Sequence, residues 1–143
     1  MQDLHYYRTL ILVADDCKAA AGTEPPVRGA NTTVAAVQYD MLADHPHEFD
    51  SEEVIFESWY RRQPNAAELS LDEKASMREQ FFSKPQACLR ASPLAKTYGW
   101  GLLFNDEGKV ALVARDSDRY QELTRGGDSD VRLVKAMRSR RGS

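Results

Sequence analysis

Residues 100–114 read WGLLFNDEGKVALVA, and this stretch indicates the fold more strongly than any other. Its two apolar runs, Trp100–Phe104 and Lys109–Ala114, have the length and composition of β-strands. The four residues between them, 105–108, end on Gly108, which adopts a positive φ without strain. We therefore expect an antiparallel β-hairpin here.

The residues that lead into the hairpin, SPLAKTYGWG at 92–101, specify both ends of a short helix. Ser92 is a favourable N-cap. Pro93 suits the first helical position, because the amide that proline lacks would have no partner there. Gly99 suits a left-handed end to the helix. We expect a helix of one to two turns.

The rest of the chain predicts one further strand and several short helices. Residues 6–14, YYRTLILVA, form a nearly continuous apolar run typical of a strand buried on both faces. Helical spacing or capping signals mark four segments: 33–43 after a cap at Asn31 or Thr32, a helix after a cap at Asp50 or Ser51, 71–82 after the Ser70–Glu73 capping box, and 117–124. The second of these also fits a short helix running into a strand, and 131–138 fits a short helix or an extended segment.

Together these elements predict an α+β fold: a small antiparallel sheet, made of the N-terminal strand and the C-terminal hairpin, packed with several short helices. The 143 residues and the hydrophobic content of 42% fit a single domain over residues 1–143. The apolar runs are too short to span a membrane and the N-terminus lacks a signal-peptide pattern, so we expect a cytoplasmic location. There, Cys17 and Cys88 are expected to be free thiols that pack as small hydrophobic side chains.

Charge is distributed unevenly along the chain. Residues 1–80 carry 15 acidic and 7 basic side chains, a balance of −8, whereas residues 81–143 carry 7 and 12, a balance of +5. Five of these twelve bases lie at the end of the chain, after the last acidic residue: Arg132, Lys135, Arg138, Arg140 and Arg141. Such a split suits an anion-binding half, and it also suits two halves that neutralise each other, within the chain or across a homodimer interface. We favour neutralisation. Nucleic acid is a partner that the modest total charge does not favour.

Five stretches, taken together, resemble a known family. They are HYYRTLILVADDCKA at 5–19, AAVQYDMLADHPHEFDSEEVIF at 35–56, FFSKPQACLRASPLAKTYGWG at 81–101, EGKVAL at 107–112 and KAMRSRR at 135–141. They resemble a family of small bacterial proteins described only as a domain of unknown function, and CLRASPLAKTYGWG is the most specific part. The resemblance implies no activity, cofactor or catalytic residue. Relatives carry a histidine where this chain has Leu103, so a role for that histidine is absent here.

The common catalytic and nucleotide-binding motifs are missing. The GWG at 99–101 lacks the third glycine of a dinucleotide fingerprint, and Gly108-Lys109 is not followed by the Ser or Thr of a phosphate loop. No nucleophile elbow and no H-E-x-x-H pattern occurs. We expect no cofactor.

Two weaker candidates for chemistry remain. His45 and His47 offer two metal ligands, with acidic neighbours to complete a site, but acidic loops with histidine are common on surfaces, so we expect no metal. Cys88 with a histidine would make a nucleophilic pair, and Arg90 and the helix start at Ser92 would favour its thiolate.

The most coherent candidate for a binding site is the set of Arg90, Ser92, Lys96, Tyr98 and Trp100. Two cations near a helix N-terminus suit an anion, and the two aromatic rings suit a flat ligand. A structural role competes with this interpretation, because Trp100 alternates with apolar strand residues and is therefore predicted to be buried. We expect a small soluble binding module for an anionic ligand. The alternatives are an enzyme that uses Cys88 or the pair His45 and His47, and a protein-interaction module that forms homo-oligomers.

Overall fold

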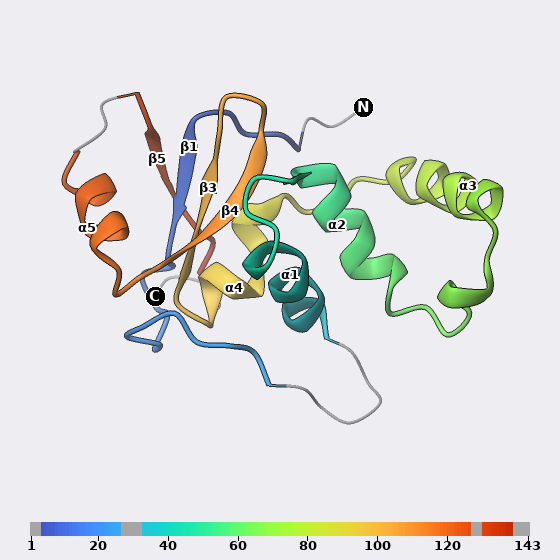
Figure 1. Ribbon diagram of the computed structural model, residues 1–143, viewed down its shortest axis with the longest axis horizontal. Helices are drawn as coiled ribbons and strands as arrows, with labels where there is room; N and C mark the ends of the chain where they lie inside the picture. The colour runs from blue at the N-terminus through green and yellow to red at the C-terminus, as the bar shows by residue number, and fades with distance from the viewer. Residues whose placement is uncertain (1–3, 27–32, 127–129, 139–143) are drawn as a thin grey trace.

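The predicted hairpin lies at the centre of the fold in the computed structural model (Figure 1). β3, Trp100–Phe104, pairs antiparallel with β4, Lys109–Ala114. The connecting loop forms as expected: Gly108 has a φ of 80°, and the side-chain oxygen of Asn105 accepts hydrogen bonds from the amides of Glu107 and Lys109 at 3.0 and 2.9 Å. The hairpin prediction is confirmed.

The structure describes residues 4–26, 33–126 and 130–138. The candidate caps Asn31 and Thr32 and the tail bases Arg140 and Arg141 lie outside these ranges.

Three more strands complete a five-stranded sheet in the order β2-β4-β3-β1-β5. They are β1 (Thr9–Leu12), β2 (Phe49–Asp50) and β5 (Arg132–Lys135). β1 pairs antiparallel with β3, as expected, and parallel with β5. Residues 132–135, for which a helix and an extended segment were both open, are therefore a strand. The predicted α+β class is confirmed, and β2 and β5 extend the three predicted strands into a mixed sheet.

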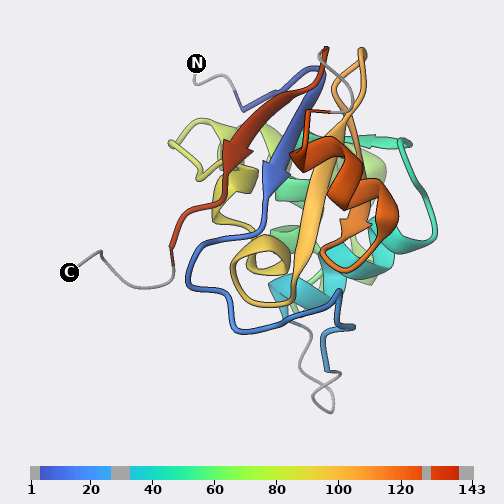
Figure 2. The ribbon, with the colours of Figure 1, turned by 90° about the vertical axis from the view of Figure 1, so that its left-hand side faces the viewer.

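Helices cover both faces of this sheet. The described residues form α1 (Val34–Ala43), α2 (Ser51–Tyr60), α3 (Leu71–Phe82), α4 (Pro93–Lys96) and α5 (Asp118–Thr124), with 3₁₀ turns η1 (Ala66–Glu68) and η2 (Leu89–Ala91). α5 lies on one face, and α1, α2 and α4 lie on the other (Figures 1 and 2). α3 extends beyond these layers, and none of its residues is fully buried.

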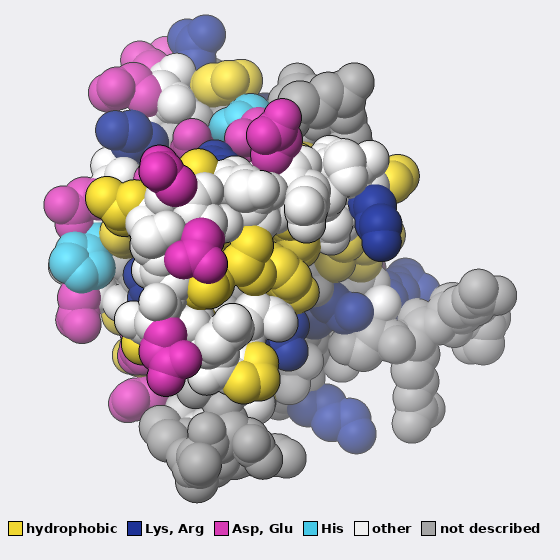
Figure 3. Space-filling view, turned by 90° about the vertical axis from the view of Figure 1, so that its right-hand side faces the viewer, with side chains coloured by type: hydrophobic (Ala, Val, Ile, Leu, Met, Phe, Trp, Pro, Cys, Tyr) yellow, Lys and Arg dark blue, Asp and Glu magenta, His cyan; other side chains and the backbone are white. Residues whose placement is uncertain are grey.

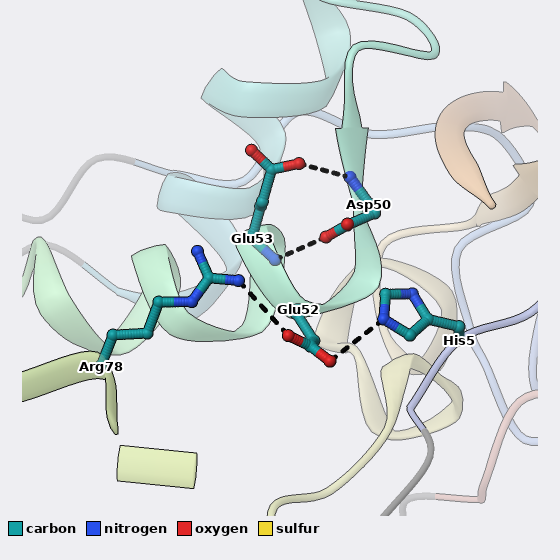
Figure 4. A network of polar contacts seen from close by, with 5 residues as sticks. All are labelled: His5, Asp50, Glu52, Glu53 and Arg78. Atoms are coloured by element: carbon teal, nitrogen blue, oxygen red, sulfur yellow. Dashed lines mark hydrogen bonds and ion pairs between the residues drawn. The ribbon is translucent and has the colours of Figure 1, made fainter. Parts of the chain in front are cut away.

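The helix starts follow the capping signals in the sequence. Asp50 caps α2, because its carboxylate accepts from the Glu53 amide at 2.9 Å while the Glu53 carboxylate accepts from the Asp50 amide at 3.1 Å (Figure 4). Ser70 and Glu73 form the same box at the start of α3. Residues 51–60 are helical throughout, so the alternative of a helix running into a strand is wrong. The cap of α1 is Thr33, whose hydroxyl accepts from the Ala36 amide at 3.1 Å, so the expected cap at Asn31 or Thr32 is wrong.

Glu52 links three separate parts of the chain. One of its carboxylate oxygens lies 3.1 Å from Nε2 of His5, in the segment before β1, and the other accepts from Arg78 of α3 at 3.4 Å (Figure 4). α3 also rests on α2 through aromatic rings, since Trp59 and Phe81 stack with centroids 5.0 Å apart. These contacts hold α3 against α2 although it is outside the core. In the described part of the chain, no helix is long and apolar enough to cross a membrane.

Candidate ligand-binding cleft

A cleft of about 230 Å³ lies where α1 and α2 meet the segment that leads into α4. Its described lining comes from α1 (Val34 and Gln38), α2 and its end (Ile55, Ser58, Trp59 and Arg62), α3 (Phe81), and residues before and at the start of α4 (Gln86, Ala87, Cys88, Leu89, Ala91, Ser92 and Pro93). Half of the lining thus comes from the segment 86–93. The cleft brings this segment together with residues far from it in sequence.

The described lining of the cleft contains no Asp or Glu, and its one charged side chain is Arg62. The Nε–H of Arg62 donates to the carbonyl oxygen of Ser58 at 2.8 Å, so one edge of the guanidinium is fixed against the end of α2. Ser58 is buried, and its hydroxyl donates to the Ile55 carbonyl at 2.9 Å. The cleft therefore combines a fixed cation with an otherwise neutral lining.

Ser92 performs its predicted capping role and also makes a contact that the sequence did not indicate. Its hydroxyl oxygen accepts from the Leu94 amide at 3.2 Å, which confirms the N-cap, and its O–H donates to the side-chain oxygen of Gln38 at 2.5 Å. Both side chains are buried. This pair ties α4 to α1 within the lining of the cleft.

Cys88 lines the same cleft and is half-buried. Its sulfur lies 3.2 Å from the hydroxyl of Tyr6, and the two groups hydrogen-bond. Burial, and secondly this hydrogen bond, raise the pKa of Tyr6 to about 12. The phenol therefore stays protonated at neutral pH and is able to donate to the sulfur. The hydrogen-bond partner that the structure gives Cys88 is thus a tyrosine, not the histidine of the nucleophilic-pair hypothesis.

The predicted ligand set does not converge on one site. Ser92 lines the cleft, whereas Arg90 donates from Nε to the Lys135 carbonyl at 2.7 Å beside β5. Trp100 contacts Tyr39 of α1, with ring centroids 5.7 Å apart, and its indole N–H donates to the Thr23 carbonyl at 2.9 Å. Lys96 and Tyr98 are half-buried, and like Arg90 and Trp100 they are not among the residues that line the cleft. α4 is only four residues long, so its helix dipole contributes little.

Trp100 is half-buried, so the prediction that it is buried is wrong in degree. It does pack against the core on the strand face it shares with Leu102 and Phe104, both of which are fully buried. The difference arises because Trp100 begins β3 at the end of the sheet. There the segment around Gly22 and Thr23 covers one part of the ring, and Tyr39 of α1 contacts another.

The two neighbouring histidines have separate partners. Nδ1 of His45 lies 2.7 Å from the Glu48 carboxylate, and Nδ1 of His47 donates to the Lys109 carbonyl at 2.9 Å. Within residues 4–26, 33–126 and 130–138, no three His, Cys, Asp or Glu side chains are grouped closely enough to hold a metal ion. Cys17 is buried and free, and Cys88 is also free.

Part of the basic tail is neutralised within the chain. The Asp15 carboxylate lies 3.0 Å from Nζ of Lys135 and 3.5 Å from a terminal nitrogen of Arg138. The hydrogen bond and charge of Lys135, followed by those of Arg138, lower the pKa of Asp15. Both of these tail bases therefore already have an acidic partner.

Reasoning from sequence missed Arg62, Gln38 and Gln86 as residues of the site. Arg62 follows α2 in a run of polar residues, where a cation ordinarily faces solvent. Gln38 gave a weak signal, because an amide on the apolar face of α1 needs a buried partner. The structure supplies that partner as Ser92.

Comparison with known proteins gives one result. A protein-family model described as a family of unknown function (DUF6157) matches residues 1–142, which is nearly the whole chain. No curated protein and no solved structure matches the chain.

Proposed function

The chain belongs to this family of unknown function, DUF6157, and we propose that it is a binding module for a small anionic ligand that occupies the cleft at Arg62. One observation carries the proposal: the described lining offers a guanidinium and several hydrogen-bonding groups but no carboxylate. This is notable in a chain whose first 80 residues contain 15 acidic side chains. A carboxylate in the lining would repel an anion, and its absence leaves the field of Arg62 unopposed there.

The fixed guanidinium suits an oxyanion. Because the Nε–H of Arg62 is occupied by the Ser58 carbonyl, the terminal N–H groups are left for a ligand oxygen. Ile55 and Leu89 add apolar side chains to the lining, whereas Arg62 itself is exposed, so solvent screens part of its attraction for an anion. The cleft volume of about 230 Å³ lies below the usual range of pockets for drug-sized ligands, so the cleft alone suits only a compact molecule.

Calorimetric titration of the purified protein with propionate tests this proposal, with propionamide as the neutral analogue of the same shape. The wild type should bind propionate more tightly than propionamide. Arg62→Gln should weaken propionate binding about tenfold, the loss of roughly one charge-assisted hydrogen bond. Arg61→Gln is the matched control, because its guanidinium lies 3.6 Å from Glu57 and does not line the cleft. Equal effects of the two substitutions, or equal binding of acid and amide, would overturn the proposal.

An enzyme that uses Cys88 is the second candidate, and the contact between Cys88 and Tyr6 favours it. The hydroxyl of Tyr6 lies 3.2 Å from the sulfur of Cys88, so a reacting thiol in the cleft would have a hydrogen-bonding group beside it. If Cys88 is a nucleophile, iodoacetamide should label it faster than a free thiol in a peptide, and propionate should protect it. Cys17, which is buried, is the internal control. Slow labelling of Cys88 would remove this candidate.

We also place the protein in the cytoplasm. The support is that both cysteines are free, which fits a reducing compartment.

A further inference from the structure

The cleft at Arg62 adjoins a second hollow, a groove of about 740 Å³ between the end of α2 and the outer side of α3. The described residues that line the groove are Trp59, Met77, Gln80, Phe81, Ser83, Lys84 and Gln86. Three of these, Trp59, Phe81 and Gln86, also line the cleft. The two hollows therefore meet along one short wall, and a ligand longer than the cleft would pass over it.

This shared wall is aromatic and partly exposed. The rings of Trp59 and Phe81 stack with an angle of 28° between their planes, and both side chains are half-buried. Met77 continues the apolar surface along α3. Figure 3 shows hydrophobic side chains gathered near the middle of the face on which α3 lies, between acidic side chains on the left of the view and several basic ones on the right.

The groove resembles the cleft in the charge of its lining. The described lining of the groove again contains no carboxylate, and its one charged side chain is Lys84, which is exposed. Residues of α3 that are acidic, such as Glu73 and Glu79, do not line it. A path that begins at Arg62 and runs over Trp59 and Phe81 toward Met77 thus crosses three apolar side chains. Polar side chains, Gln80, Ser83, Lys84 and Gln86, line the rest of the groove, and no described carboxylate lines either hollow.

We infer that the ligand of this site is an elongated amphipathic anion of the medium-chain carboxylate type. Its head group lies at Arg62, and its alkyl chain crosses Trp59 and Phe81 to reach Met77. This inference rests on the proposed function and adds the ligand class to it. A compact anion would leave the aromatic wall in water, whereas an alkyl chain laid along the wall removes apolar surface of both partners from water. Met77 is suited to such a contact, because its flexible thioether adapts to chains of different shape.

A chain-length series tests the inference separately from the proposed function. Calorimetry compares propionate, hexanoate and octanoate, all below the concentration at which octanoate forms micelles, with octanol as the neutral long-chain probe. Each added methylene should tighten binding up to about fourfold, which corresponds to ~0.8 kcal/mol for a buried methylene. Octanoate should bind more tightly than octanol, because only the acid engages Arg62.

Two variants on the same helix locate the alkyl chain. Met77→Gln replaces an apolar groove residue by a polar one of similar length and should weaken octanoate binding severalfold while leaving propionate binding unchanged. Leu71→Gln is the matched control, because Leu71 is 86% exposed and does not line the groove. It should change neither affinity.

The outcomes distinguish the two proposals. If propionate binds through Arg62 but affinity does not rise with chain length, or if Met77→Gln weakens both acids equally, the ligand class is wrong and the proposed function stands. Equal affinities for propionate, hexanoate and octanoate would mean that the groove does not bind an alkyl chain and would favour a macromolecular partner for it. If octanol binds as tightly as octanoate and Arg62→Gln changes nothing, both proposals fall.

Discussion

Ser92 donates a hydrogen bond of 2.5 Å to the side-chain oxygen of Gln38, and this buried contact joins α4 to α1 in the lining of the cleft. The same hydroxyl oxygen accepts from the Leu94 amide and so caps α4. One side chain therefore starts a helix and fixes its position against another. The site depends on this contact, because the residues on either side of Ser92 line the cleft.

Ser92→Ala should destabilise the protein by about 2–3 kcal/mol, because it removes a cap worth ~1 kcal/mol and leaves a buried amide oxygen without its donor. Ser70→Ala is the control. Ser70 caps α3 in the same way but is exposed and has no buried partner, so its loss should cost only about 1 kcal/mol. Urea denaturation of both variants measures the difference. Equal costs would mean that the contact with Gln38 contributes nothing.

Trp100→Ala should destabilise the protein by about 2–4 kcal/mol, somewhat less than a fully buried aromatic, because Trp100 is half-buried. Trp100→Phe keeps one aromatic ring but removes the hydrogen bond to Thr23 and part of the contact surface of the indole, so it should cost about 1–2 kcal/mol. Denaturation midpoints give both values. A midpoint for Trp100→Ala close to that of the wild type would show that the ring does not support the fold.

The raised pKa of Tyr6 makes the free energy of unfolding change with pH in the alkaline range. Burial and the contact with Cys88 raise its pKa to about 12 in the folded chain, whereas a tyrosine in the unfolded chain has an ordinary pKa of about 10. The unfolded state therefore loses the phenolic proton first, and stability falls as pH rises from 10 toward 12. Phenylalanine has no phenolic proton, so the stability of the wild type relative to Tyr6→Phe should fall over this range. Denaturation at several pH values measures it, and a constant difference would contradict the raised pKa.

Cys88→Ala separates the two main causes of that raised pKa. Burial is the larger cause and the contact with Cys88 is the second, so the substitution should reduce the pH effect without abolishing it. The same denaturation series, run with Cys88→Ala, checks this. Complete loss of the effect would show that the thiol, not burial, controls Tyr6.

Asp15 neutralises two cations of the basic tail and so weakens the attraction of the tail for anions. Lys135 and Arg138 already pair with it, so labelled single- and double-stranded oligonucleotides should not bind the wild type at physiological salt. Asp15→Asn frees both cations and should allow weak binding at low salt that falls steeply as salt rises. Fluorescence anisotropy measures both proteins. Tight binding by the wild type at physiological salt would revive nucleic acid as a partner.

Local signals in the sequence were sufficient for most of the elements. Three features depend on a few neighbouring residues and are therefore visible without the fold: the hairpin loop at 105–108, the capping box at Ser70 and the cap at Ser92. For α2 the sequence left the cap open between Asp50 and Ser51, and the structure places it at Asp50. β5 was ambiguous, because a four-residue edge strand in parallel pairing with β1 is determined by its distant partner rather than by its own pattern.

The site was harder to predict because it is formed by long-range contacts. Ser92 was recognised, but Gln38 lies 54 positions away and Arg62 belongs to another helix end, so neither was linked to it. Arg90, Lys96 and Trp100 were expected to act with Ser92 because they are close to it in sequence. They lie on η2, α4 and β3, three short elements that direct their side chains to different parts of the molecule. Arg90 reaches the β5 backbone, and Trp100 contacts Tyr39 and Thr23.

The most direct test of the cleft uses the two tryptophans of the chain as reporters. Trp59 lines the cleft, whereas the indole N–H of Trp100 is bonded to Thr23 outside it. In a nitrogen–proton correlation NMR spectrum, each indole gives its own signal during a titration with octanoate. A ligand at Arg62 should shift the Trp59 indole signal and the Arg62 Nε–H signal in a saturating manner and leave the Trp100 indole unchanged. A shift of Trp100 with no change at Trp59 and Arg62 would contradict the account and place the ligand at Arg90, Lys96 and Trp100 instead.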